Sequence, residues 1–525
     1  MSDDFKVVDI KKAVADRVQT EAADLVDSAG DSEITEKFVL DCLRANERGD
    51  GLLFIAIHRH RFLYNNAAAE WMHWTGHHWE RDVMGHHHRA VEDVSLKYLE
   101  IAFGLKGRID KAIRDEDGQL AKQLGETRTN LFKRVSKLRS SSGCETCLKF
   151  ARLNIDPLAI HGKEIDTNPW LLATKNGVID LRNGIHSPGN PEDYLLKASP
   201  IEWKGLDEEC PLFNKFLLEV FNGDQEVVDY VIRLFGYGLT GLVTEHIFPV
   251  LQGQGRNGKS VLVDLIRYVL GELAGPIESE MLLDQGRSKS SAGPSPDIMR
   301  LKGMRIAFAS ETDEGRKFSS ARVKWLTGGD PLVGRNPHDK YPTDFDPTHL
   351  LILLTNSKPH AHGDDFAFWE RMHLIFFGLS FVNREPKAEN ERQANKGLIE
   401  ELKKEAPGIL AKLVRGCLDW KKKGLNPPAI VKDATASYRR DEDLIAGFIE
   451  DCCEESADGS CGSTDAYKAF ENWYRLEVGH KVPSQKVFGQ LMGKKFERAK
   501  SGGKKIYRGL VIIDHGQDSF GEKEY

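Results

Sequence analysis

The chain has 525 residues, of which 40% are hydrophobic and 29% are charged, and it carries a formal net charge of −7 at pH 7. This length predicts about three or four domains with packed cores. The acidic balance excludes a protein that coats nucleic acid through bulk positive charge, so any nucleic-acid contact must come from local basic patches. There is no run of about 18 apolar residues, which excludes a membrane-spanning helix. The eight scattered cysteines indicate a reducing, cytoplasmic compartment, and the acidic N-terminus lacks the apolar stretch of a secretory signal.

The first 245 residues divide into three predicted segments. Residues 1–47 form an acidic helical segment, in which apolar residues recur at helical spacing between Val14 and Val26. Residues 48–205 mix short apolar runs with turn signals such as Asn176-Gly177, and they predict an N-terminal domain of mixed structure. Residues 206–245 predict a helical linker or collar.

The remaining segments are predicted to be a central domain, an extension and a tail. Residues 246–383 alternate strands with helices, which predicts an α/β domain with a parallel sheet. Apolar runs such as LLILL fit strands that are covered on both faces. Residues 384–430 predict a helical extension, and residues 431–525 predict a small C-terminal domain. The predicted strands of the sheet are Phe248–Gln252, Arg305–Ala309, Leu350–Thr355 and Met372–Phe377.

The strongest motif is a glycine-rich loop of the form G-x-x-x-x-G-K-[ST] between a predicted strand and a predicted helix. Glycines let the main chain fold around phosphates with its N–H groups pointing inward. Lys259 is expected to reach the β- and γ-phosphates of ATP, and the Ser260 hydroxyl to bind Mg²⁺. The helix that follows adds its positive N-terminal end. The loop consists of Gly253, Gln254, Gly255, Arg256, Asn257, Gly258, Lys259 and Ser260.

Three polar residues at the ends of later strands are candidates for catalysis. Glu311 follows a strand and is expected to polarise the attacking water and help to hold Mg²⁺, with Asp313 and Glu314 as nearby alternatives. Asn356 can bond both water and γ-phosphate, because an amide is donor and acceptor. Arg371 can neutralise transition-state charge as an arginine finger. Each residue also has a structural alternative without a catalytic role. Glu311 would be a solvated loop acid, Asn356 a turn residue and Arg371 a surface arginine.

In this order the motifs resemble those of the superfamily 3 helicases, and most closely the phage and plasmid primase–helicase family, which is related to the poxvirus primase-helicase. The resemblance extends over residues 50–455. It rests on KWLTGGD (324–330), FDPTHLLILLTN (345–356), RIAFASE (305–311), NPWLLATKNGVIDLRNG (168–184), PGILAKLVRGCLDWKKKGL (407–425) and ASYRRDEDLIAGFIED (436–451).

The resemblance implies an AAA+-like core assembled as a homo-hexameric ring, with ATP between subunits and Arg371 serving the neighbouring subunit's site. Single-stranded DNA would pass through the channel with 3′→5′ translocation, in a virus, phage, plasmid or integrated element that supplies a separate primase or polymerase. A hairpin from Pro331 to Asp346 would grip this strand through Arg335, His338 and Lys340. The alternative for each of these side chains is an incidental charge on an exposed turn.

The sequence departs from the family pattern in three respects. Ser310 stands where many P-loop enzymes carry an aspartate, so Mg²⁺ would depend on Ser260, Glu311, phosphates and water. Glu370 precedes Arg371 where a second arginine is often found. The 47 residues before the helicase-associated region are too few for a primase domain, so we expect no priming within this chain.

The C-terminal stretch 483–513 predicts a helix, a strand, a turn at Ser501-Gly-Gly503 and a second strand, which is the pattern of a winged helix. Its basic residues suit contacts to duplex phosphates, with a solubilising surface as the alternative. The residues assigned to DNA are Lys494, Lys495, Lys504 and Lys505.

Three weaker signals in the sequence are better explained by protein structure than by a binding site. The histidines between His58 and His88 show no spacing typical of a metal site. Cys144-x-x-Cys147 has no second pair, which argues against zinc. Trp71, Trp74 and Trp79 are expected to pack in a core rather than to stack on bases.

The leading hypothesis is therefore an ATP-driven replicative DNA helicase. An origin-binding initiator or helicase loader, whose ATPase melts or remodels DNA without processive unwinding, is the second hypothesis. A scaffold that binds ATP without hydrolysing it is the third, and the intact set Lys259, Glu311, Asn356 and Arg371 argues against it.

Overall fold

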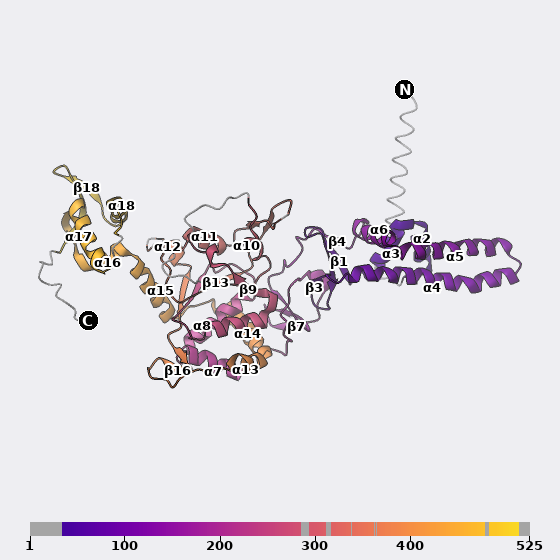
Figure 1. The fold of residues 1–525 in the computed structure, drawn as a ribbon, viewed down its shortest axis with the longest axis horizontal. Helices are drawn as coiled ribbons and strands as arrows, with labels where there is room; N and C mark the ends of the chain where they lie inside the picture. Colours follow the sequence, from indigo (N-terminus) through magenta and orange to yellow (C-terminus); the bar gives the residue numbers. More distant parts are fainter. Residues whose placement is uncertain are drawn as a thin grey trace, which may run out of the picture. The chain divides into compact units, whose positions relative to one another are not determined.

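The computed structural model describes residues 34–284, 293–310, 317–337, 339–361, 363, 365–477 and 482–513. The chain divides into two compact units, residues 1–205 and residues 206–525. Figure 1 shows their helices and strands. Across the described residues, no helix combines the length and the apolar character that crossing a bilayer requires.

The first unit is built around helices, two of them long. Tyr98, Leu131 and Val135 belong to the buried apolar cluster that joins these helices. The two long helices lie side by side as a hairpin (Figure 1). Sequence patterning missed this hairpin, because α5 buries only Leu131, Val135 and Leu138 and is otherwise polar. The helices are α2 (Glu36–Arg44), α3 (Asn46–His58), α4 (His86–Arg114), α5 (Gly118–Leu138) and α6 (Ser141–Leu153).

Two small sheets complete the first unit. The strands of the first follow the order β3-β2-β1-β4, and those of the second follow β5-β6-β7. Lys175 and Asn176 connect β5 to β6, so the predicted turn forms at this place, although Gly177 is the first residue of β6 and pairs with Thr174. The strands are β1 (Phe62–Asn65), β2 (Glu70–Trp74), β3 (Trp79–Arg81), β4 (Ala159–Ile160), β5 (Leu171–Thr174), β6 (Gly177–Asp180) and β7 (Ile185–Ser187), with a 3-10 turn η1 (Pro191–Asp193).

The second unit contains a five-stranded sheet of order β14-β8-β13-β10-β9, in which every neighbouring pair is parallel. The predicted α/β class and parallel sheet are thus confirmed. All four predicted strands form. The sheet also has a fifth strand, β9, which was not predicted because it carries a glycine and a proline. The strands are β8 (Phe248–Gln252), β9 (Ala274–Ile277), β10 (Ile306–Ser310), β13 (Leu350–Thr355) and β14 (Met372–Phe376).

Helices pack around this sheet. The pair α8 and α14 approaches closely at Gly236, where an added Cβ would lie 2.2 Å from the main-chain nitrogen of Cys417. The helices are α7 (Pro211–Val220), α8 (Gln225–Gly238), α9 (Lys259–Leu270), α10 (Pro296–Met299), α11 (Ser320–Leu326), α12 (Phe366–Trp369), α13 (Leu398–Lys404), α14 (Ala406–Lys423) and α15 (Ala429–Glu442). Shorter pieces are η2 (Gly271–Leu273), η3 (Ser279–Met281), β11 (Leu332–Gly334), β12 (Thr343–Phe345), β15 (Ser380–Val382) and β16 (Glu391–Gln393).

The C-terminal part of the second unit runs helix, strand, helix, helix, strand, strand. Its antiparallel sheet has the order β17-β19-β18. Phe448, Phe470 and Phe488 are fully buried against one another in its core. The elements are α16 (Leu444–Cys452), β17 (Cys453–Gly462), α17 (Ser463–Glu477), α18 (Gln485–Lys495), β18 (Arg498–Ser501) and β19 (Lys504–Ile512).

Candidate nucleotide site

The site lies at the carboxyl edge of the parallel sheet, where three strands end together. Thr355 of β13 pairs with Gln252 of β8, so the residues that follow them, Asn356 and Gly253, emerge side by side. On the other side of β13, Ser310 pairs with Leu354, so β10 ends at the same edge. Ligands bind at this edge in open α/β sheets. Glu311 lies outside the described residues, as do Asp313 and Glu314.

Two glycines shape the loop between β8 and α9. A Cβ on Gly253 would lie 2.4 Å from the side-chain nitrogen of Asn257 and 2.4 Å from the carbonyl oxygen of Phe377. Gly258 caps α9 with a φ of 88°, a conformation that glycine adopts without strain. A side chain at either position would therefore push the loop off its neighbours.

Lys259 is the buried cation of this loop. Only 6% of the residue is exposed. Its Nζ donates to the carbonyl oxygen of Gly253 and, at 3.3 Å, to the Oδ1 of Asn356. Burial lowers the pKa of Lys259 to about 8, because an ammonium loses hydration there. A phosphate beside the ammonium would offset that loss.

The donor set of the loop fits a polyphosphate. Within the described residues, the main-chain N–H groups from Gln254 to Gly258 donate to no protein acceptor. The N-terminus of α9, a helix of 12 residues, directs its positive end at the same place. Ser260 is exposed in its first turn, where a hydroxyl can ligate Mg²⁺. ATP bound with Mg²⁺ would supply a phosphoryl group here, with Lys259 and Asn356 against its oxygens.

Arg371 lies at the opposite edge of the sheet. It directly precedes Met372, which pairs with Phe248 at the start of β8, whereas the phosphate loop follows the end of β8. Five residues of strand separate the two positions, or about 16 Å at 3.3 Å per residue. Its Nη1 donates to the carbonyl oxygen of Ala367 at 2.7 Å, and its buried Nε has no partner among the described residues. Arg371 therefore does not join the phosphate loop of its own chain.

An ion pair that sequence patterning missed supports the segment before Arg371. Lys324, in the KWLTGGD motif, donates from Nζ to both carboxylate oxygens of Asp365, at 2.9 and 3.1 Å. Asp365 also caps α12, by accepting from the N–H of Phe368. The motif thereby fixes the helix that leads into Arg371.

The predicted hairpin forms from β11 and β12, which pair in antiparallel register. The guanidinium of Arg335 donates to the carbonyl oxygen of Asp339 at 3.2 Å, so it braces the loop rather than extending from it. Lys340 is exposed, and its ammonium lies 5.3 Å from the ring centre of Tyr341, which is itself 68% exposed. His338 lies outside the described residues. Lys340 and Tyr341 are thus both accessible to solvent on this loop.

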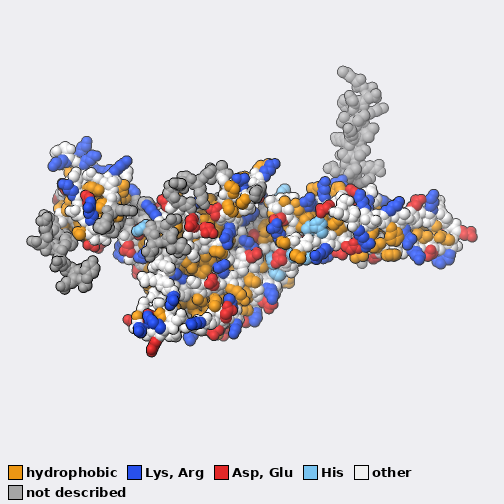
Figure 2. Space-filling model, viewed as in Figure 1, with side chains coloured by type: hydrophobic (Ala, Val, Ile, Leu, Met, Phe, Trp, Pro, Cys, Tyr) orange, Lys and Arg blue, Asp and Glu red, His pale blue; other side chains and the backbone are white. Residues whose placement is uncertain are grey.

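The predicted basic residues of the C-terminal part lie on α18 and the β18–β19 hairpin. All four are exposed, and Figure 2 shows Lys and Arg side chains gathered over this hairpin. Lys495 donates to the carboxylate of Asp443 at 2.9 Å, so part of its charge is already neutralised. Lys504 and Lys505 follow the Gly502-Gly503 turn.

The histidine-rich segment has a structural role centred on Asp82. Its buried carboxylate accepts from the main-chain N–H and the Nδ1 of both His86 and His87, at 2.6 to 2.9 Å, and so caps α4. Folding also brings ligand atoms of His73, Asp82 and His86 within 4.8 Å of one another, a cluster that linear spacing does not show. Within this cluster, the Nδ1 of His86 is hydrogen-bonded to Asp82 at 2.8 Å.

Two other weak signals are resolved by burial. Cys147 is buried and donates to the carbonyl oxygen of Asp50, which is a packing role. Trp79 is buried in a core cluster and donates to the carbonyl oxygen of Pro191. Trp71 and Trp74 are only partly buried.

Comparisons with known proteins identify relatives among large DNA viruses. Residues 51–222 match the family model described as "D5 N terminal like". The chain is 28% identical over 451 residues to "Putative helicase L207/L206" of Acanthamoeba polyphaga mimivirus, covering 82% of this chain and 46% of that one. It is 29% identical over 337 residues to "Putative helicase 121R" of Invertebrate iridescent virus 3, covering 59% of this chain and 35% of that one. The chain therefore spans less than half the length of these curated relatives.

A further relative and one solved structure widen the comparison. "Putative primase C962R" of African swine fever virus (isolate Tick/Malawi/Lil 20-1/1983) is 23% identical over 339 residues, covering 60% of this chain and 34% of that one. The solved C-terminal region of NrS-1 aligns with a TM-score of 0.40 and 14% identity, covering 63% of this chain and 80% of that one. The predicted resemblance to the primase–helicase family is confirmed by the matching domain and the viral relatives.

Proposed function

We propose that this chain, which carries the D5 N-terminal-like domain of the primase–helicase family, is an ATP-driven DNA helicase of a virus or mobile element. It hydrolyses ATP with Mg²⁺ and uses the energy to move along single-stranded DNA in the 3′→5′ direction. The working form is a ring, a homo-hexamer, with a primase or polymerase as a separate partner.

The observation that carries this proposal is the contact between Lys259 and Asn356 at the carboxyl edge of the sheet. The loop supplies a buried cation and a row of main-chain donors, and the neighbouring strand supplies an amide beside the cation. Positioning and charge stabilisation are what phosphoryl transfer requires from a protein. This geometry supports a hydrolytic site more than a site that only binds ATP.

The place of Arg371 supports a ring. An arginine finger must touch the γ-phosphate, and Arg371 is about 16 Å of strand from the loop of its own chain. A neighbouring subunit that packs its phosphate loop against this edge would receive the guanidinium. Arg371 is only partly buried, so its guanidinium can be approached by a neighbouring subunit.

Two surfaces support contact with DNA. The exposed pair Lys340 and Tyr341 on the β11–β12 loop offers a cation for a phosphate and a ring for a base. The C-terminal arrangement of three helices and a three-stranded sheet, with Lys504 and Lys505 on its exposed hairpin, supports a winged-helix-like module for duplex phosphates. The names of the viral relatives, helicase and primase, support action on nucleic acid in general.

A strand-displacement assay on tailed duplexes tests the proposal. The substrates are duplexes with a single-stranded 3′ tail or 5′ tail, and Lys259→Ala is the inactive control. We expect ATP-dependent displacement from the 3′ tail only. ATP hydrolysis without displacement from either tail would instead support the initiator or loader hypothesis. Hydrolysis by Lys259→Ala at the wild-type rate would refute the assigned site.

A further inference from the structure

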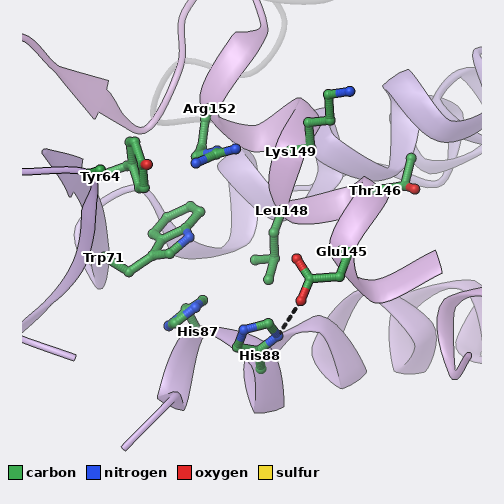
Figure 3. A pocket seen from close by; sticks show the side chains of 10 residues that line it. Tyr64, Trp71, His87, His88, Glu145, Thr146, Leu148, Lys149 and Arg152 are labelled. Atoms are coloured by element: carbon green, nitrogen blue, oxygen red, sulfur yellow. Dashed lines mark ion pairs between the residues drawn. The ribbon is translucent and has the colours of Figure 1, made fainter. Parts of the chain in front are cut away.

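The first unit contains a cavity of about 350 Å³ that the proposed motor does not use. Figure 3 shows it between two strands and two helices. Strands β1 and β2 contribute Tyr64 and Trp71, the first turn of α4 contributes His87 and His88, and α6 contributes one helical face. The wall from α6 consists of Glu145, Thr146, Leu148, Lys149 and Arg152. All of these except Thr146 lie at positions i, i+3, i+4 and i+7 of one helical face.

Aromatic rings form one side of the cavity. The indole of Trp71 stacks on the imidazole of His87, with ring centres 5.1 Å apart and planes 18° apart. Tyr64 meets Trp71 edge to face at 5.4 Å. Asp82 fixes His87 by accepting from its Nδ1 at 2.6 Å. The rings are therefore held in place before any ligand arrives.

Two cations, Arg152 and Lys149, also line the cavity. The guanidinium of Arg152 lies 4.3 Å from the ring centre of Tyr64 and so presents a flat, charged surface beside the rings. Lys149 is exposed at the rim. Among the described residues, no carboxylate lies within salt-bridge distance of either cation, whereas Glu145 faces His88 at 3.7 Å. Their positive charge is available to an anion.

We propose that this cavity binds a nucleoside phosphate, with the base against the Trp71 and Arg152 side and the phosphate on Lys149 and Arg152. Bases stack on aromatic side chains and on arginine planes, and phosphates are bound by lysine and arginine. The volume is at the lower end of ligand sites, which suits one nucleotide unit rather than two. That unit is supplied either by a single DNA strand or by a free nucleotide.

A photocrosslinking experiment tests the inference on the full chain, without ATP. The probe is a 12-nucleotide strand that carries 5-iododeoxyuridine, and the site is read by mass spectrometry of the tryptic peptide 62–81, which contains Tyr64 and Trp71. We expect a crosslink in this peptide. Excess unlabelled strand should abolish it in either case and so shows that the site saturates. Millimolar dTMP should abolish it if a free nucleotide is the natural ligand, and should leave it if a strand is. A wild-type protein with no crosslink there would overturn the inference.

Two charge reversals provide the matched comparison. Lys149→Glu should lower the crosslink yield about tenfold, because the phosphate then meets a negative charge. Lys106→Glu reverses an equally exposed lysine on α4, 19 residues from His87 or about 28 Å along the helix, and should leave the yield unchanged. Equal yields for the two variants would overturn the phosphate contact. Repeating the experiment with Lys259→Ala separates this cavity from the motor, since the crosslink should survive even though ATP hydrolysis is lost.

Discussion

The ammonium of Lys259 lies 3.3 Å from the side-chain oxygen of Asn356, although 97 residues separate them in the chain. Parallel pairing of β8 with β13 creates this contact, because it brings the ends of both strands to one edge. The amide therefore holds the lysine in the nucleotide-free protein. A γ-phosphate entering the loop would compete for the same ammonium, so the hydrogen bond from Lys259 to Asn356 would weaken when a nucleotide binds.

Nucleotide affinity is expected to fall as the pH rises above about 8. The pKa of Lys259 in the nucleotide-free protein is lowered to about 8 by burial, so the lysine is charged below that pH and neutral above it. Binding a phosphate requires the charged form, so affinity should drop about tenfold per pH unit once the free lysine is neutral. Titration of a fluorescent ATP analogue between pH 7.5 and 9.5 measures this dependence. Lys259→Arg is the control, since a guanidinium does not titrate there, and a matching slope in that variant would assign the effect to another group.

Arg371→Ala should retain nucleotide binding and lose turnover by about 10³-fold or more, because an arginine finger acts on the transition state. Mixing this variant with Glu311→Ala tests the arrangement between subunits. Each interface would take its arginine from one subunit and its glutamate from the next, so mixed rings rebuild some intact sites. Partial recovery of ATPase activity is expected on mixing. The absence of recovery at every mixing ratio would show that both groups serve one chain or that no ring forms.

Lys340→Ala should uncouple hydrolysis from movement. In the proposed motor the exposed Lys340 and Tyr341 would hold the DNA strand once per ATP cycle, whereas the glycine-rich loop is built from other elements. Unwinding is therefore expected to fall sharply while basal ATPase activity stays near the wild-type rate. Lys387→Ala, at another exposed lysine, is the matched control and should affect neither. If Lys340→Ala lost ATPase activity to the same extent as unwinding, the cause would be a folding defect and not the loss of a DNA contact.

Arg134→Ala should destabilise the first unit by about 3–5 kcal/mol at pH 7, because it removes the cation beside a buried carboxylate. The Nη1 of Arg134 lies 3.3 Å from Asp50, which is 3% exposed and also accepts from the hydroxyl of Tyr98 at 3.0 Å. Hydrogen exchange of peptides from α3, α4 and α5 measures the local opening free energy.

The loss in Arg134→Ala should depend on pH. Burial raises the pKa of Asp50 from 3.8 to about 6. The folded state therefore holds a proton that the unfolded state releases between these values, and stability from this group declines as the pH rises through that window. Without Arg134 the carboxyl is easier to protonate, so the destabilisation should be smaller at pH 5 than at pH 7. The double variant Asp50→Asn/Arg134→Ala should recover most of the stability that Arg134→Ala loses at pH 7. If the double variant were as unstable as Arg134→Ala, the unpaired charge of Asp50 would be excluded as the cause of the destabilisation.

The sequence by itself determined the glycine-rich loop and the strands around it. The loop is a local motif, in which neighbouring residues carry the chemistry, and the strands are apolar runs long enough to recognise. Gly258 has the same local origin, since its φ of 88° belongs to the turn itself, whereas the need for glycine at 253 comes in part from the tertiary contact with Phe377. The long helices α4 and α5 escaped detection, because their buried stripe is narrow and most of their surface is polar.

Only the tertiary structure decided which of these pieces meet. Hydrophobic periodicity defines a strand but not its neighbour in the sheet, so the contact of Lys259 with Asn356 and the distance of Arg371 from the loop followed only from the order β14-β8-β13-β10-β9. The cavity of the first unit has the same origin. Trp71, His87 and Arg152 come from a strand and two helices that pack only in the folded unit, and no spacing along the chain relates them.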